Sequence, residues 1–129
     1  MKDDCRVHAV SDARDLRAAL GRFATGVTVV STRSGEGRFE GLTVNSFSSV
    51  SLDPPLVLWS IRKNAPSLLS FRNAPYFAIN VLGAEQEAYC RHFATPATDK
   101  FAGVPFRCGL GGCPLLADSI ASFELSVVR

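Results

Sequence analysis

The alternation of apolar and polar positions changes its period along this chain. Residues 11–24 carry Leu16, Leu20 and Phe23 at the i, i+4 and i+7 spacing of one helical face. Ser11 is a candidate N-cap for this segment, and Gly26 is a candidate C-cap. The pattern therefore predicts an amphipathic helix near the start of the chain.

After this helix, the pattern becomes typical of strands. The β-branched and aromatic content predicts strands over residues 27–32, 39–50, 56–61, 76–82 and 120–128. Short helices are expected over residues 66–72 and 84–94, and loops over 95–114. No later segment follows the last strand to pair with it. Because strands and helices do not alternate regularly, the predicted fold class is mainly β with helical additions, an antiparallel barrel.

The composition limits the size, the compartment and the partners. With 129 residues, 47% of them apolar, the chain can form one domain with a hydrophobic core. Its net charge of +2 is too small to indicate a nucleic-acid or membrane partner. No apolar run reaches the ~20 residues of a membrane-spanning helix, and the charged N-terminus is not a secretory signal. We therefore expect a cytoplasmic protein with reduced cysteines.

The densest polar stretch covers residues 43–51, where six of nine side chains carry a hydroxyl or a carboxamide. A half-buried strand would alternate polar and apolar positions, and this stretch does not. Such short hydrogen-bonding side chains suit a phosphate or a polar heterocycle. The alternative is an irregular edge strand wetted by solvent.

A second polar segment, residues 62–67, follows the apolar strand and opens a short helix. The N–H groups at a helix start, together with Lys63 and Ser67, would form an anion site. A solvated turn with an ordinary N-cap is the alternative.

Metal and nucleophile patterns are weak in this sequence. Cys90, His92, Cys108 and Cys113 have C-x-H and C-x4-C spacings, and neither is a typical zinc pattern. We favour buried, unreactive thiols. The sequence contains no G-x-S-x-G and no G-x-G-x-x-G. No metal ligand is therefore predicted, and these motifs single out no catalytic side chain, while a Ser–His–acid triad stays open as an alternative.

Five stretches of the sequence carry ordered motifs: 17–32 (RAALGRFATGVTVVST), 41–56 (GLTVNSFSSVSLDPPL), 77–82 (FAINVL), 99–103 (DKFAG) and 112–115 (GCPL). Together they resemble the short-chain flavin reductases, which supply reduced flavin to two-component monooxygenases. The resemblance extends from about residue 16 to residue 128.

This resemblance implies a single flavin reductase-like domain over residues 1–129, folded as an FMN-binding split β-barrel and usually a homodimer. Family members run a few dozen residues further, through a Gly-Asp-His motif near the nicotinamide, so the chain is expected to lack the C-terminal strands. The family's flavin-lining positions correspond to Thr43, Asn45, Ser46, Ser49 and Ser51. Its positions near the ribityl phosphate correspond to Ser60, Lys63, Asn64 and Ser67.

The activity implied by the resemblance is hydride transfer from NADH or NADPH to FMN or FAD, with the reduced flavin passing to a partner monooxygenase. Such a reaction needs little side-chain chemistry, because the cofactors carry it. Three alternatives remain: a flavin-binding module without turnover, an oxidase of the pyridoxamine-phosphate type, and a nucleic-acid-binding barrel. The last would need exposed aromatic side chains, whereas Trp59 and Phe77 lie in apolar strands and are expected in the core.

Overall fold

This computed structural model describes residues 2–9, 27–45, 48–53 and 55–128. In strands β1 (Lys2–Ala9) and β4 (Ser48–Leu52), the description is confined to the backbone. The helix expected over residues 11–24 and the candidate site residue Ser46 lie outside the described residues.

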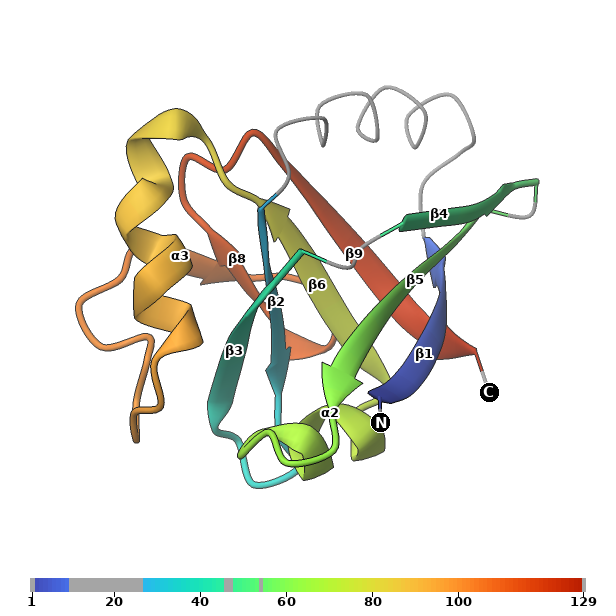
Figure 1. Ribbon diagram of the computed structural model, residues 1–129, viewed down its shortest axis with the longest axis horizontal. Coiled ribbons are helices and arrows are strands. Elements are labelled where there is room, and N and C mark those ends of the chain that lie inside the picture. The colour runs from blue at the N-terminus through green and yellow to red at the C-terminus, as the bar shows by residue number, and fades with distance from the viewer. Residues whose placement is uncertain (1, 10–26, 46–47, 54, 129) are drawn as a thin grey trace.

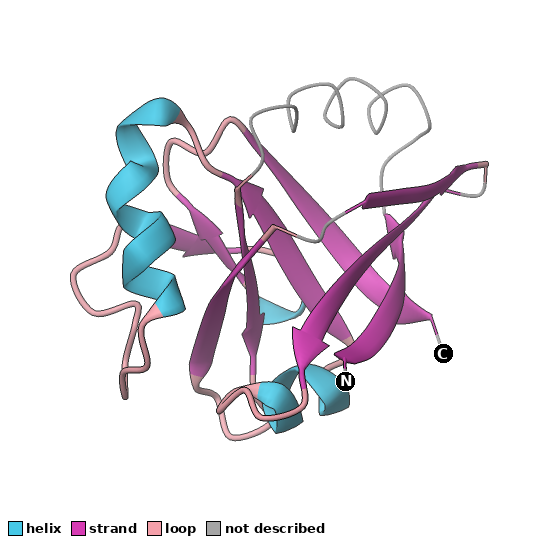
Figure 2. Ribbon diagram, viewed as in Figure 1, coloured by secondary structure: helices cyan, strands magenta, loops and turns pink. Residues whose placement is uncertain are grey.

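Seven strands form one antiparallel sheet, the larger of the two sheets in the described chain (Figures 1 and 2). The order of its strands is β3-β2-β6-β9-β1-β5-β4. Besides β1 and β4, the sheet contains β2 (Thr28–Arg33), β3 (Phe39–Val44), β5 (Pro55–Arg62), β6 (Tyr76–Val81) and β9 (Ala121–Val128). The predicted fold class, mainly β and antiparallel, is therefore confirmed.

A small hairpin and short helices surround the sheet. The hairpin consists of β7 (Phe106–Cys108) and β8 (Pro114–Leu116). The helices are α2 (Leu68–Asn73) and α3 (Glu87–Ala94), with 3-10 turns at Ala84–Gln86 and Leu110–Gly112. Figure 2 shows α3 beside the sheet and α2 at one end of it. Within the described ranges, no helix has the length and apolar character needed to cross a membrane.

The sheet curls until its β3 end approaches β5 (Figure 1). Val44 of β3 packs in the same buried core as Val57, Trp59 and Ile61 of β5, although the two strands are not neighbours in the sheet. Trp59 is 1% exposed and Phe77 is also buried in this core, as predicted. The fold is thus the split barrel that the resemblance implied, with its core between the two ends of the sheet.

Strand β2 is buried on both faces and joins this core to a second one. Because strand side chains alternate, Val30 points into the barrel core, whereas Val29 packs with Phe93 of α3 and with Phe101. The second core therefore attaches α3 to the outer face of the sheet, beside β3.

The expectation of one continuous strand over residues 39–50 was wrong. β3 ends at Val44 and pairs with β2, whereas β4 begins at Ser48 and pairs with β5. The interruption falls within the polar stretch 43–51, where the apolar alternation needed for a single buried face is lost. The two halves of this stretch therefore belong to opposite ends of the sheet.

The final strand takes both of its partners from earlier in the chain. β9 lies between β6 and β1, and it is antiparallel to both. Strand β1 was not predicted, because its sequence KDDCRVHA opens with three charged residues and alternates only over Cys5, Val7 and Ala9. Its place between β9 and β5 follows from tertiary pairing, which local sequence patterns do not reveal.

Candidate functional site

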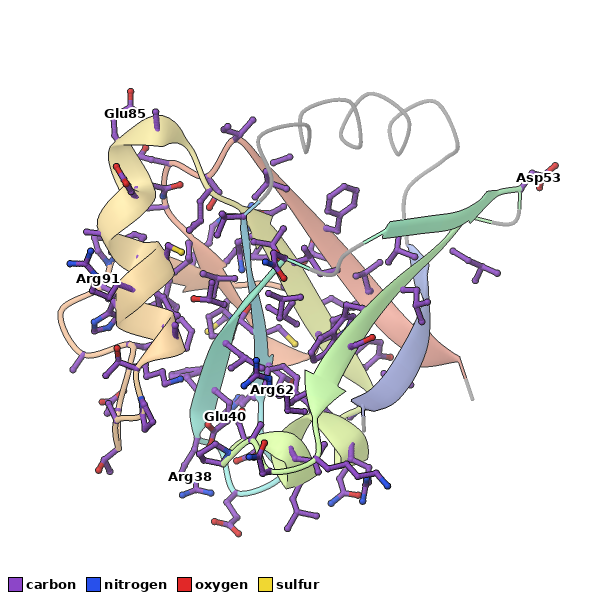
Figure 3. All side chains as sticks on the ribbon, viewed as in Figure 1. Arg38, Glu40, Asp53, Arg62, Glu85 and Arg91 are labelled. Atoms are coloured by element: carbon purple, nitrogen blue, oxygen red, sulfur yellow. The ribbon has the colours of Figure 1, made fainter. Side chains whose placement is uncertain are left out.

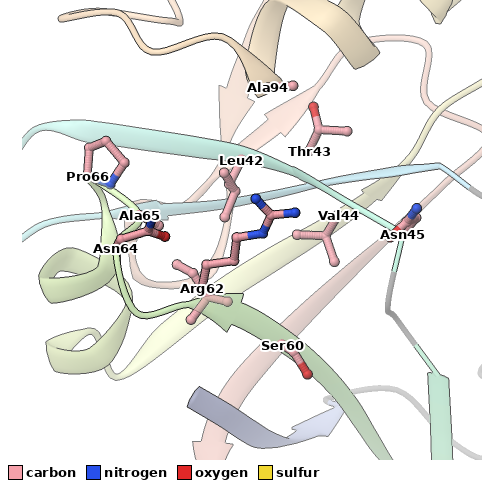
Figure 4. Close-up of a pocket in the computed structure, with 11 residues that line it drawn as sticks. Leu42, Thr43, Val44, Asn45, Ser60, Arg62, Asn64, Ala65, Pro66 and Ala94 are labelled. Atoms are coloured by element: carbon pink, nitrogen blue, oxygen red, sulfur yellow. The ribbon is translucent and has the colours of Figure 1, made fainter. Parts of the chain in front are cut away.

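A cavity of about 520 Å³ lies at the mouth of the barrel, between the ends of β3 and β5 (Figure 4). The turn after β5 and the last residue of α3 complete its wall. The described residues that line it are Leu42, Thr43, Val44, Asn45, Ser60, Ile61, Arg62, Asn64, Ala65, Pro66 and Ala94. This volume falls within the ~300–1,000 Å³ typical of sites for small molecules and cofactors.

The cavity joins the two polar segments that the sequence analysis selected. Thr43 and Asn45 come from the first segment, and Ser60 and Asn64 come from the end of β5 and the turn after it. These pairs are separated by 15 or more positions in the sequence. The curl of the sheet brings them to one site, because β3 and β5 are the strands that close the barrel core.

The other proposed site residues within the described ranges are not among those that line this cavity. Lys63 is exposed in the turn between two lining residues. Ser67 is buried at the N-cap position of α2 and makes no side-chain capping hydrogen bond. For Ser49 and Ser51 the structure gives only the backbone, where they pair with Val57 and Leu56 of β5.

The Thr43 side chain is turned towards α3. Its hydroxyl donates a 2.7 Å hydrogen bond to the carbonyl oxygen of Cys90. Figure 4 shows this side chain directed towards the end of α3 at Ala94. The proton of the hydroxyl is therefore used within the protein, and Thr43 can face a ligand with its backbone and with a hydroxyl lone pair.

Arg62 is a lining residue that was not among the predicted site residues. Figures 3 and 4 show its side chain extending from β5 towards β3, whereas Arg38, Glu85 and Arg91 lie on the periphery. Its residue is exposed, and neither ion pair found among the described residues involves it. Its position at the start of the polar segment 62–67, directly after an apolar strand, was the signal that could have identified it.

The lining combines a cation with neutral hydrogen-bonding groups. The guanidinium of Arg62 can bind a phosphate in a bidentate manner, and Lys63 adds a second positive charge nearby. The amides of Asn45 and Asn64 can both donate and accept. None of the described lining residues is acidic, so an anion would meet no repulsion from the wall itself. This chemistry suits a phosphorylated ligand with a polar ring.

The cysteine and histidine residues of the described chain do not form a metal site. Among the residues that the structure describes, no three His, Cys, Asp or Glu side chains gather closely enough to hold an ion. Cys90, Cys108 and Cys113 are free thiols, with Cys113 buried and Cys108 exposed.

The chain belongs to the flavin reductase family. A family model described as the flavin reductase like domain matches residues 20–129, which is most of the sequence. The resemblance seen in the sequence motifs is therefore confirmed.

Individual relatives agree with this assignment. A probable flavin reductase of Rhizobium meliloti is 48% identical over 118 residues, which cover 92% of this chain and 38% of that protein. The reductase component of a flavin-dependent trigonelline monooxygenase from Acinetobacter baylyi is 50% identical over 94 residues, covering 73% of this chain and 30% of its own. The chain thus spans well under two thirds of the length of either relative.

A solved structure shares both the fold and part of the sequence. The NADH:FAD oxidoreductase of Streptomyces globisporus, in complex with NAD and FAD fragments, matches with a TM-score of 0.70 and 35% identity. The match covers 93% of this chain and 84% of that chain. The split barrel described above is therefore the architecture of a flavin reductase.

Proposed function

We propose that this chain is an NAD(P)H-dependent flavin reductase, in which the cavity between β3 and β5 binds FMN or FAD. The observation that carries the proposal is the convergence of Asn45, Ser60, Arg62 and Asn64 on one cavity, in a chain of the flavin reductase family. The named relatives support the same class, since one is an NADH:FAD oxidoreductase and another serves a monooxygenase.

The residues of the chain have binding and orienting roles in this proposal. Arg62 and Lys63 neutralise the phosphate, and Ser60, Asn64 and Ser67 complete that end of the site. Asn45 and the backbone from Thr43 onward, with Ser46, Ser49 and Ser51, line the polar edge of the flavin. A flavin held by these residues would supply the hydride acceptor of the reaction, with NADH or NADPH as the hydride donor and solvent as the source of the proton. Donors at the polar edge stabilise the negative charge that develops there.

We also propose a partner enzyme, an oligomeric state and a compartment for this activity. Reduced flavin passes to a flavin-dependent monooxygenase, as the name of the Acinetobacter baylyi relative suggests. The protein acts as a homodimer, because both β3 and β4 are sheet edges whose backbone groups another chain can satisfy. The cytoplasm is the expected compartment, since NADH and NADPH are available there.

The test is the anaerobic absorbance of the flavin band after NADH is added to the purified 129-residue chain with FMN or FAD. Rapid loss of the band is expected, and Arg62→Ala should slow it at limiting flavin. Arg38→Ala, which changes an exposed arginine remote from the cavity, is the matched control. Flavin binding without loss of the band would favour the binding module without turnover. Absence of flavin binding would contradict both functions.

A further inference from the structure

Lys100 is a half-buried lysine whose ammonium group joins two elements of the fold. It lies in the loop between α3 and β7. Its Nζ donates to the carbonyl oxygen of Gly41 in β3 at 3.1 Å and to that of Phe93 in α3 at 2.7 Å. Burial lowers the pKa of this amine, and the negative charge of Glu40 acts in the opposite direction. The two carbonyl acceptors offset part of the cost of removing the ammonium from water.

The acceptor in α3 is one that a helix leaves unsatisfied. Phe93 is the second-last residue of α3, and the last four carbonyl groups of a helix have no partner within it. These carbonyls also carry the negative end of the helix dipole, so a positive charge is favourable there. Lys100 therefore holds the C-terminal end of α3 specifically.

Both acceptors lie directly beside the proposed flavin cavity. Gly41 precedes the lining residue Leu42, and Phe93 precedes the lining residue Ala94. One turn earlier in α3, the hydrogen bond from Thr43 to the Cys90 carbonyl makes a second connection between the same two elements. Hydrogen bonds at two positions of α3, Cys90 and Phe93, therefore set the position of Ala94 relative to β3.

The contact between α3 and β3 is close enough to require a glycine. A Cβ at Gly41 would lie 2.8 Å from Cδ1 of Phe93 and 3.0 Å from Cε2 of Phe101. The backbone of Lys100 is itself anchored, because its carbonyl oxygen lies 2.6 Å from Nε2 of His92. The ammonium thus acts from a loop whose backbone is itself held to α3.

We propose that Lys100 is a positioning residue for the flavin cavity: it holds the C-terminal end of α3 against β3 and so fixes the wall at Ala94. Lys100 does not line the cavity, and it acts through the elements that do. This inference rests on the proposed function, because it assumes that the cavity receives flavin.

The experiment compares Lys100→Met, Lys100→Arg and the control Arg91→Met, which changes an exposed residue of α3. The dissociation constant for FMN is measured by flavin fluorescence, and amide hydrogen exchange of residues 87–95 is followed without ligand. Loss of the ammonium should weaken FMN binding about tenfold and speed exchange in α3. Arginine retains donors and should restore most of the affinity, while Arg91→Met should match the unmodified chain. At saturating FMN, kcat should change little, so the weaker binding should appear as a higher KM for FMN.

Two outcomes would overturn the inference: unchanged exchange in Lys100→Met, or unchanged FMN affinity in a folded Lys100→Met. Should that variant fail to fold, Lys100→Gln decides by the same readouts, since it shortens the side chain and removes the ammonium. If the unmodified chain binds no FMN, the proposed function fails. The exchange measurement then still decides whether Lys100 holds α3.

Discussion

Two groups of polar side chains in this molecule differ in how their hydrogen bonds are used. Asn80 in β6 is fully buried, and all of its polar atoms have protein partners. Its Nδ2 donates to the Val29 carbonyl at 3.0 Å and to Ser31 Oγ at 3.2 Å, while its Oδ1 accepts from Leu116 N at 3.0 Å and Ser122 Oγ at 3.1 Å. We call these four bonds the Asn80 network.

The cavity between β3 and β5 presents the opposite case. Asn45, Arg62 and Asn64 are exposed at its wall, where their polar groups can meet a ligand. The Asn80 network contributes to stability, because each of its groups would be costly to bury alone. The cavity side chains contribute to binding, because their hydrogen-bonding capacity remains accessible. The same residue type, asparagine, therefore has different roles in the two regions.

The largest effect is expected from breaking the Asn80 network. Asn80→Leu leaves the Leu116 N–H and the Val29 carbonyl buried without their partner, so the free energy of unfolding should fall by about 3 kcal/mol. Urea denaturation measures this change. Asn64→Leu is the matched control and should change stability by less than about 0.5 kcal/mol while weakening FMN binding. Equal free energies of unfolding for Asn80→Leu and Asn64→Leu would contradict the stabilising role of the Asn80 network.

A second prediction concerns the contact behind the cavity wall. Gly41→Ala forces a Cβ to within 2.8 Å of the Phe93 ring and should lower the free energy of unfolding by about 2 kcal/mol. Gly35→Ala is its control, because a Cβ there meets no heavy atom within 4 Å. Thermal unfolding monitored by circular dichroism checks both. A change in Gly41→Ala no larger than in Gly35→Ala would contradict the close approach.

A third prediction addresses the cavity without touching the core. Arg62→Ala should raise the FMN dissociation constant about tenfold, since it removes a charged hydrogen-bonding partner of the phosphate. The free energy of unfolding should stay within about 0.5 kcal/mol of the original value, because Arg62 is exposed. Titrations at two salt concentrations check the mechanism. The variant should show a weaker salt dependence, and an unchanged slope would argue against an ionic contact.

The smallest effect concerns a buried thiol next to Thr32 of β2. Cys113 is 1% exposed, with its Sγ 3.9 Å from Thr32 Oγ1, and burial raises the pKa of this thiol above its ordinary 9.0. Between 9.0 and the raised folded pKa, the folded state holds a proton that the unfolded state has released. The contribution of the protonated Cys113 thiol to the free energy of unfolding is therefore complete below pH 9.0. This contribution is lost as pH rises through the folded pKa.

The unfolding free energies of the original chain and Cys113→Ala, measured by urea denaturation at pH 7 and pH 10, test this sign. The advantage of the original chain should shrink at the higher pH. Cys108→Ala, where the thiol is exposed, controls for the loss of a thiol alone. An advantage that grows with pH would contradict the sign.

Much of the strand content was predictable from local patterns. The β-branched run after residue 26 and the apolar run LVLWSI correspond to β2 and β5, and the buried position of Trp59 followed from its apolar neighbours. The pattern failed at β1, which begins with three charged residues and pairs with β5 and β9. It failed again between β3 and β4, because these two strands pair with different strands, and such pairing depends on the tertiary structure.

For the candidate site, the sequence by itself determined the chemistry: two short polar segments, one with hydroxyl and carboxamide groups and one with adjacent cations. Only the tertiary structure decided that Asn45, Ser60 and Asn64 share one cavity, and that Arg62 reaches into it. It also decided that the Thr43 hydroxyl donates a hydrogen bond to α3, and that the Lys100 ammonium donates a second one to the same helix. The physical reason is that side-chain type is a local property, whereas proximity depends on how the sheet curls and which strands close the barrel.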